Sequence, residues 1–242
     1  MRLKFCCKRD VGRDAWGDPL CDRQDLVFLG SSEPGDTFSW VEFVLTVTTN
    51  GAFFVPVMML LRRKRCTDAL TGAALALTST AYHACETTGT KFLSMNAGNW
   101  HRLDNLFSIA GAQVLGQLVA GPTLKGSFYR SFFFFLGVVL QELQPWKIAT
   151  ILFPILAAHG AAFIYVYCYD DNHWRRIRTF SFFRACLVQI AAFALFLRGL
   201  DHESDSLRAF HGAFHVTTAL SASLFIKALD PLHSSGKEKK YN

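Results

Sequence analysis

The chain has 242 residues, of which 51% are hydrophobic and only 18% are charged, and it contains 23 phenylalanines. Soluble domains carry about a quarter charged residues, so this composition argues against a water-soluble globular protein. The formal net charge of +6 does not indicate nucleic-acid binding, because the basic residues fall in short clusters between apolar stretches. The composition therefore predicts an all-α, polytopic membrane protein.

Residues 1–38 form a polar N-terminal tail that lacks the apolar core of a cleavable signal peptide. We expect this tail to be lumenal or extracellular, for the reasons of charge given below. One alternative stays open, because the basic segment at residues 2–9 contains adjacent cysteines, Cys6 and Cys7, as in a cytosolic palmitoylation site.

Residues 39–230 contain seven apolar stretches that approach the roughly 20 residues needed to cross a bilayer. They cover about 40 to 61, 69 to 88, 103 to 120, 128 to 143, 148 to 169, 180 to 197 and 207 to 229. The fourth stretch is the weakest, since its strictly apolar part is short. The sequence predicts a membrane domain of seven transmembrane helices, followed by a basic tail at residues 231–242.

The basic residues predict the orientation of this domain. Lys and Arg concentrate in the first, third and fifth loops and in the C-terminal tail, whereas the sixth loop is acidic. Because short cytosolic loops retain basic residues, this alternation fits seven spans with a cytosolic C-terminal tail, and six spans would break it. We expect an endoplasmic reticulum or Golgi membrane ahead of the plasma membrane.

Four ionisable side chains lie at the ends of apolar stretches: His83, Asp104, His211 and His215. Such groups are costly at membrane depth and usually have a function. At about 1.5 Å per helical residue, the predicted topology brings all four to one depth near the outer surface. We therefore expect them to form a single site.

The spacing of these residues is typical of a metal centre. His211 and His215 are four residues apart, which places both imidazoles on one helix face. With His83 they would give a zinc ion three ligands and leave a fourth position, where bound water loses its proton near neutral pH. Asp104 can accept that proton and pass it to a leaving group. Ser79, one turn before His83, can steady an oxyanion or orient a substrate carbonyl.

Other interpretations of the same residues remain. Taken singly, each could serve helix packing or bond back to its own helix. Glu86 is a rival carboxylate, and His101, in a predicted loop, is a rival ligand. Both rank lower because each is closer to the water phase. The common depth of His83, Asp104 and the two later histidines favours a metal site over independent packing roles.

A Ser-x-x-x-His pattern in the second stretch, an Asp in the third and His-x-x-x-His in the seventh resemble the CREST superfamily of seven-span metal hydrolases. That superfamily includes the alkaline ceramidases, the progestin and adipoQ receptors, the GPI-lipid-remodelling enzymes and the myomaker-like proteins. Three segments look most like the ceramidases: Glu42-Phe43 followed by Thr46-Val47-Thr48-Thr49-Asn50, Leu103-Asp104-Asn105-Leu106, and His211-Gly212-Ala213-Phe214-His215. Tyr82-His83-Ala84-Cys85-Glu86 is more similar to the myomaker relatives.

The ceramidase resemblance implies that His83, His211 and His215 hold zinc, that Asp104 handles protons and that Ser79 assists at the carbonyl. It also implies a calcium site with Glu42 as a ligand. Asp22 is the second candidate for calcium, although its stretch matches the N-terminal ceramidase motif only in part.

The expected activity is zinc-dependent hydrolysis of an amide bond in a membrane lipid, with ceramide as the best single substrate. The alternative is a non-catalytic membrane receptor or a myomaker-like fusion protein in which zinc is a structural clamp. A clamp would fill all four zinc positions, whereas an enzyme keeps one for water. The sequence indicates no nucleic-acid partner.

Overall fold

The computed structural model describes residues 39–120, 126–145, 147–169, 179–200, 205 and 207–228. The chain divides into two units, Met1–Phe38 and Ser39–Asn242, and every described residue belongs to the second. The predictions for the two tails, including Asp22 and the Cys6–Cys7 pair, lie outside the described residues.

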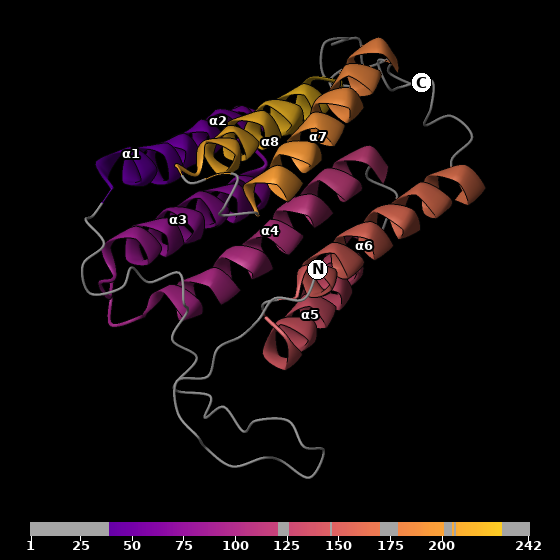
Figure 1. Cartoon of the computed structure of the whole chain (residues 1–242). Helices are drawn as coiled ribbons and strands as arrows, with labels where there is room; N and C mark the ends of the chain where they lie inside the picture. Colours follow the sequence, from indigo (N-terminus) through magenta and orange to yellow (C-terminus); the bar gives the residue numbers. More distant parts are fainter. Residues whose placement is uncertain are drawn as a thin grey trace, which may run out of the picture. The chain divides into compact units, whose positions relative to one another are not determined.

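The described part of the chain is built from seven long helices (Figure 1). The first runs through four consecutive elements: α1 (Trp40–Phe43), the π-helix η1 (Val44–Thr48), the 3-10 helix η2 (Thr49–Phe53) and α2 (Phe54–Arg62). The others are α3 (Cys66–Thr88), α4 (Ala97–Ala120), α5 (Gly126–Leu143), α6 (Ile148–Tyr169), α7 (Thr179–Gly199) and α8 (Ala209–Ala228). Within these residues the only extended pairing is an isolated bridge between Phe92 and Met95, so the all-α prediction is confirmed.

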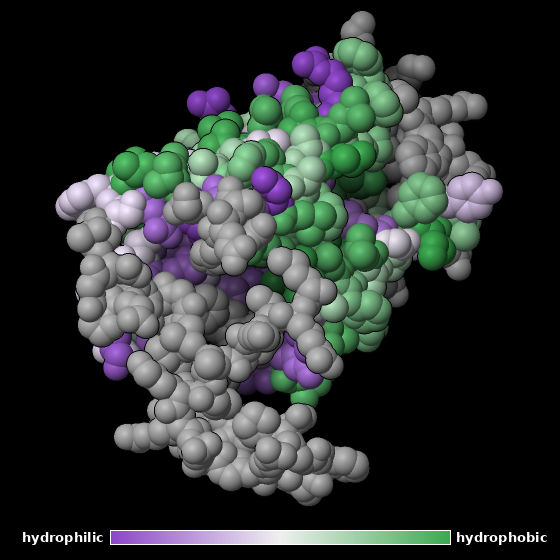
Figure 2. Space-filling model, in the orientation of Figure 1, coloured by the Kyte–Doolittle hydropathy of each residue, from purple (hydrophilic) through white to green (hydrophobic). Residues whose placement is uncertain are grey.

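The outer surface of these helices is apolar, as expected for a protein in lipid. Large hydrophobic side chains such as Leu156 on α6 and Phe180 on α7 are 67% and 74% exposed. Figure 2 shows apolar side chains spread across much of the visible face of the described helices. A soluble protein would bury most of these groups, because each gains roughly 1.5–3 kcal/mol on leaving water. The chain is an integral membrane protein.

The predicted number of membrane spans, seven, is corrected to four by the length and apolar content of the described helices. Among the described residues, four helices are long and apolar enough to cross a bilayer: Trp40–Arg62, Ile148–Tyr165, Phe180–Gly199 and Ala209–Ala228. The remaining helices, α3, α4 and α5, have 23, 24 and 18 residues but carry more polar groups. Those polar groups include Glu86 on α3, Asp104 on α4 and Arg130 on α5, which lower the apolar content that a lipid-facing span requires.

Packing places the irregular first helix between α3 and α8, and α4 against α3, α5, α6 and α8, while α7 packs on α8. One apolar cluster joins α2, α3, α4 and α8 through Leu60, Ala69, Val114 and Ile226. Van der Waals packing of this kind holds helices together where lipid removes the hydrophobic driving force between them. The core therefore holds α3 and α8, the two helices that carry the histidines, on either side of the first helix.

The first helix departs from regular α geometry between Val44 and Phe53. In this stretch the Thr46 hydroxyl donates to the Glu42 carbonyl at 2.9 Å, and the Thr49 hydroxyl donates to the Leu45 carbonyl at 2.6 Å. The Asn50 amide donates to the Thr46 carbonyl at 2.8 Å. Such side-chain bonds compete with the backbone ladder and bend helices. The π and 3-10 turns follow from this polar run, and single π turns are common at functional sites.

Gly212 marks the closest approach of α8 to this irregular segment. A Cβ built at Gly212 would lie 2.6 Å from the Leu45 carbonyl oxygen, which is backbone and cannot rotate away. Only glycine fits between His211 and Ala213 at this contact. The irregular helix and the start of α8 are therefore packed backbone to backbone.

We expect Gly212→Ala to destabilise the protein by about 1–3 kcal/mol, because α8 or η1 must shift to admit the methyl group. Gly160→Ala is the matched control, since Gly160 is also a helical glycine but has no atom within 4 Å of its Cβ position. Thermal unfolding in detergent would measure both. Equal unfolding temperatures for the two variants would show that the close contact at Leu45 is not tight.

Candidate metal centre

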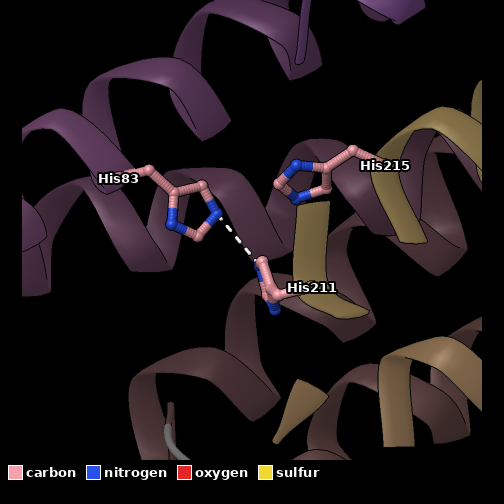
Figure 3. A group of neighbouring side chains, drawn as sticks. All are labelled: His83, His211 and His215. Atoms are coloured by element: carbon pink, nitrogen blue, oxygen red, sulfur yellow. Dashed lines mark hydrogen bonds between the residues drawn. The ribbon is translucent and has the colours of Figure 1, made fainter. Parts of the chain in front are cut away.

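Three buried histidines meet between α3 and α8. His83 comes from α3, and His211 and His215 come from α8, where their spacing of four residues puts both rings on one face (Figure 3). One ring nitrogen from each lies within 4.8 Å of the other two. The Nε2 atoms of His83 and His211 are 3.1 Å apart. The structure thus brings together the three imidazoles that the sequence analysis grouped.

The separation of two of these nitrogens can be compared with that in a tetrahedral zinc site. Nitrogen ligands at about 2.0–2.1 Å from tetrahedral zinc lie roughly 3.3 Å from one another. The observed 3.1 Å between His83 Nε2 and His211 Nε2 is close to that separation, and one ring nitrogen of His215 lies within 4.8 Å of both other rings' ligand atoms. Imidazole nitrogen is a preferred zinc donor, and a set of three histidines occurs in catalytic zinc sites.

The start of α8 is fixed by a buried carboxylate. Asp205, which is 3% exposed, accepts hydrogen bonds from the backbone N–H groups of Phe210 and His211, both at 3.1 Å. These are donors that the first turn of a helix leaves without a partner in the helix itself. Arg208 adopts a left-handed conformation with φ 56°, which turns the chain into α8. The backbone position of His211 is therefore set by its own helix cap.

Glu86 lies directly behind His83. Its Oε2 is 3.1 Å from His83 Nδ1 and 3.5 Å from an Nη2 of Arg208, and its Oε1 accepts from the Tyr82 hydroxyl at 2.7 Å. From the sequence, Glu86 ranks below Asp104 as the proton carrier because Glu86 is closer to the water phase. The three-residue spacing of His83 and Glu86 was the available signal, since residues three apart on a helix are neighbours.

Thr49 occupies the corresponding place behind His215. The Thr49 hydroxyl oxygen is 3.2 Å from His215 Nδ1. The sequence placed Thr49 in the Thr46–Asn50 run that resembles the ceramidases, but it gave this threonine no role at the site. The packing of α8 against η2 is what brings Thr49 to the histidine.

Asp104 and Ser79 lie beside the histidines rather than among them. The Asp104 carboxylate lies close to the Ser79 side chain and within electrostatic range of His83 and Glu86. Ser79 is 2% exposed on α3, one turn before His83. The predicted proton carrier and the predicted hydroxyl are therefore neighbours at the edge of the imidazole cluster. Asp104 is outside the three-residue group that could share one ion.

Two further predicted residues have different outcomes. Glu42, on α1, is partly buried and lies within electrostatic range of Arg208, Glu86 and His83, so it is close to the histidine cluster. Asp22, the other calcium candidate, is outside the described residues, so no calcium pairing can be placed.

His101 lies on α4 and not in a loop. The Asn96 side chain caps this helix by accepting a hydrogen bond from the Asn99 N–H at 3.0 Å. The helix therefore begins before the apolar stretch from which its start was predicted. The His101 ring packs on Tyr82 with centroids 4.9 Å apart, and His101 is not one of the three clustered ligands.

Comparison with known proteins gives one family. The family model described as "Protein of unknown function (DUF3522)" matches residues 38–216. The match covers well over half of the chain and takes in Ser79, His83, Asp104, His211 and His215. No curated protein matches the chain.

Proposed function

The chain belongs to DUF3522, a family of proteins of unknown function, and we propose that this member is a zinc-dependent hydrolase of an amide bond in a membrane lipid. The proposal rests first on the composition of the site. Three buried imidazoles, from His83, His211 and His215, converge within 4.8 Å in a protein whose outer surface is apolar. Ionisable side chains buried in a membrane protein cost free energy, so a group of them in contact usually marks a functional site.

The three histidines would hold the zinc ion. When bound, zinc would supply a Lewis acid and lower the pKa of a coordinated water molecule. Asp104 is the proposed general base: it would take a proton from the attacking water and deliver it to the leaving amine nitrogen. Its position beside His83 places it at the edge of the cluster, where a proton carrier is needed.

Ser79 would act at the same edge. A hydroxyl has one hydrogen to donate, and the Ser79 side chain lies next to the Asp104 carboxylate. This contact would hold the carboxylate in place before a substrate arrives. On substrate binding the same hydroxyl could turn to the carbonyl oxygen of the scissile amide, the role that the sequence first suggested for it.

A membrane lipid is the proposed substrate class because the site lies among helices with apolar outer surfaces. A lipid can reach such a site laterally, with its polar head and scissile bond at the depth of the ends of α3 and α8. Ceramide is the proposed lipid and the endoplasmic reticulum or Golgi the proposed membrane. Ceramide is supported by the likeness of the Leu103-Asp104-Asn105-Leu106 and His211–His215 segments to the alkaline ceramidases.

A lipid-product assay tests this proposal. Purified protein in mixed micelles would be incubated with a panel of ceramides of different acyl length and with phospholipids, and free fatty acid and amine products would be measured. We expect fatty acid and sphingoid base from ceramide. Release of fatty acid from phospholipids alone would show that the hydrolysed bond is an ester and not an amide. Hydrolysis of none of these lipids would favour a receptor or a fusion protein with a structural metal site.

A further inference from the structure

The residues behind His83 and His215 determine which nitrogen of each ring carries hydrogen. A neutral imidazole has one N–H donor and one bare nitrogen acceptor, and only the bare nitrogen can bind a metal. Free neutral histidine in water prefers the hydrogen on Nε2. His83 and His211 face each other through their Nε2 atoms. For Nε2 of His83 to bind a metal, the hydrogen of this ring must be on Nδ1, which is the opposite of the preference in water.

At His83 the reversal follows from Glu86. Two donors contact this carboxylate, the Tyr82 hydroxyl on Oε1 and Arg208 Nη2 on Oε2, and His83 Nδ1 lies 3.1 Å from Oε2. An ionised carboxylate accepts hydrogen bonds and cannot donate them. His83 Nδ1 must therefore carry the hydrogen, and its Nε2 presents a lone pair toward His211.

At His215 the reversal follows from Thr49. The single hydroxyl hydrogen of Thr49 is directed to the Leu45 carbonyl at 2.6 Å, with the Thr46 carbonyl farther away at 3.4 Å. The Thr49 oxygen can then only accept from His215, whose Nδ1 is 3.2 Å away. His215 Nδ1 carries the hydrogen, and Nε2 of His215 is bare.

We propose that Glu86 and Thr49 are positioning residues that fix His83 and His215 as Nδ1–H tautomers, so that the Nε2 lone pairs of both rings are available to one cation. The two residues come from different elements, α3 and η2, and act on ligands from α3 and α8. Partners of this kind orient metal-bound histidines and make them better ligands. This inference deepens the proposed function and rests on it for the identity of the cation.

Arg208 extends this arrangement to the beginning of α8. It contacts Glu86 through Nη2 and the Gly199 carbonyl through Nη1 at 3.4 Å. The backbone N–H of Arg208 donates to the carbonyl of Asp205 at 2.9 Å, and Asp205 is the residue that caps α8. Glu86 is therefore connected both to His83 and to the segment that positions His211, which links the histidines of the two helices.

The test reads the tautomers directly. Histidine ring nitrogens labelled with ¹⁵N would be assigned by NMR in the metal-free full-length protein, with zinc affinity measured separately by competition titration. The variants are Thr49→Val, which keeps the shape and removes the acceptor, and Glu86→Gln, which keeps the length and removes the charge. Thr48→Val is the matched control, because the Thr48 hydroxyl is exposed and bonds only back to Val44. Thr49→Ser restores a hydroxyl.

We expect hydrogen on Nδ1 of both His83 and His215 in the unaltered protein. Thr49→Val should move the hydrogen of His215 to Nε2 and weaken zinc binding about 10–100-fold, as loss of such a partner typically does. Glu86→Gln should weaken zinc binding over the same range, whereas Thr48→Val and Thr49→Ser should change neither the spectrum nor the affinity.

Two results separate the inference from the proposed function. Hydrogen on Nε2 of His83 or His215 in the unaltered protein, or an unchanged His215 spectrum in folded Thr49→Val, would overturn the positioning role even if zinc binds. The expected tautomers together with no zinc binding would overturn the zinc proposal and leave the roles of Glu86 and Thr49 in place. Thr49→Val replaces a hydroxyl by a methyl group in a partly buried position, so it tests the inference even if Glu86→Gln fails to fold.

Discussion

Purified protein should contain about one zinc ion per chain, and the double variant His211→Ala, His215→Ala should retain less than about a tenth of it. The reason is geometric. Both substitutions remove ligands from one face of α8 and leave His83 as the only imidazole of the cluster. Metal content would be measured by elemental analysis after dialysis against a weak chelator.

His159→Ala is the matched control for this loss. His159 is an exposed histidine on α6, bonded through Nδ1 to the Ile155 carbonyl at 2.8 Å and outside the histidine cluster. That variant should keep its zinc. Retention of zinc by the double variant, with a normal unfolding temperature, would show that the metal is bound elsewhere and would remove the basis of the proposed activity.

The second large effect is expected at Asp104. Asp104→Asn should keep the zinc ion but lower lipid hydrolysis by about 10²–10⁴-fold, the usual contribution of a positioned acid–base group. An amide has nearly the shape of the carboxylate and can still meet Ser79, but it cannot take a proton from water. Initial rates on ceramide and metal content would be measured on the same preparation.

Glu142→Gln is the control for removal of a carboxylate. The Glu142 side chain is 67% exposed on α5 and forms an ion pair with Arg102 at 3.7 Å. Exposed pairs of this kind contribute roughly 0–1 kcal/mol, so this variant should hydrolyse lipid normally. Full activity in Asp104→Asn would transfer the role of base to Glu86 or remove the enzymatic interpretation.

The helical membrane fold was predictable because it depends on composition over long stretches. Boundaries predicted from apolar content were less accurate, as at α4, which begins at Ala97 instead of about residue 103. The first turns of that helix are polar and are held by the Asn96 cap, a local contact that hydropathy does not record. The same polar content on α3, α4 and α5 is why four helices, and not seven, have the composition of membrane spans.

The histidine cluster was predictable because its residues are rare in apolar stretches and have helical spacing. His211 and His215 could be grouped from their helical spacing alone. His83 could be added to them because it is predicted at the same depth on another helix. Asp104 and Ser79 were placed together by the same argument, and they do lie side by side.

The residues behind the histidines were not predictable in the same way. Thr49 reaches His215 only because the first helix contains a π turn and because Gly212 lets α8 approach Leu45. The approach of α8 to Leu45 is a tertiary contact, which the sequence of either helix alone does not reveal. Glu86 was visible as a neighbour of His83, but its role depends on the position of Arg208, which lies 122 residues farther along the chain.

The most direct test of the proposed function is the metal dependence of lipid hydrolysis. Purified protein would be assayed on ceramide as isolated, after removal of metal with a strong chelator, and after return of zinc. We expect hydrolysis to be lost with the metal and to be restored by about one equivalent of zinc per chain. Hydrolysis that continues at the same rate in protein shown to be free of metal would contradict it.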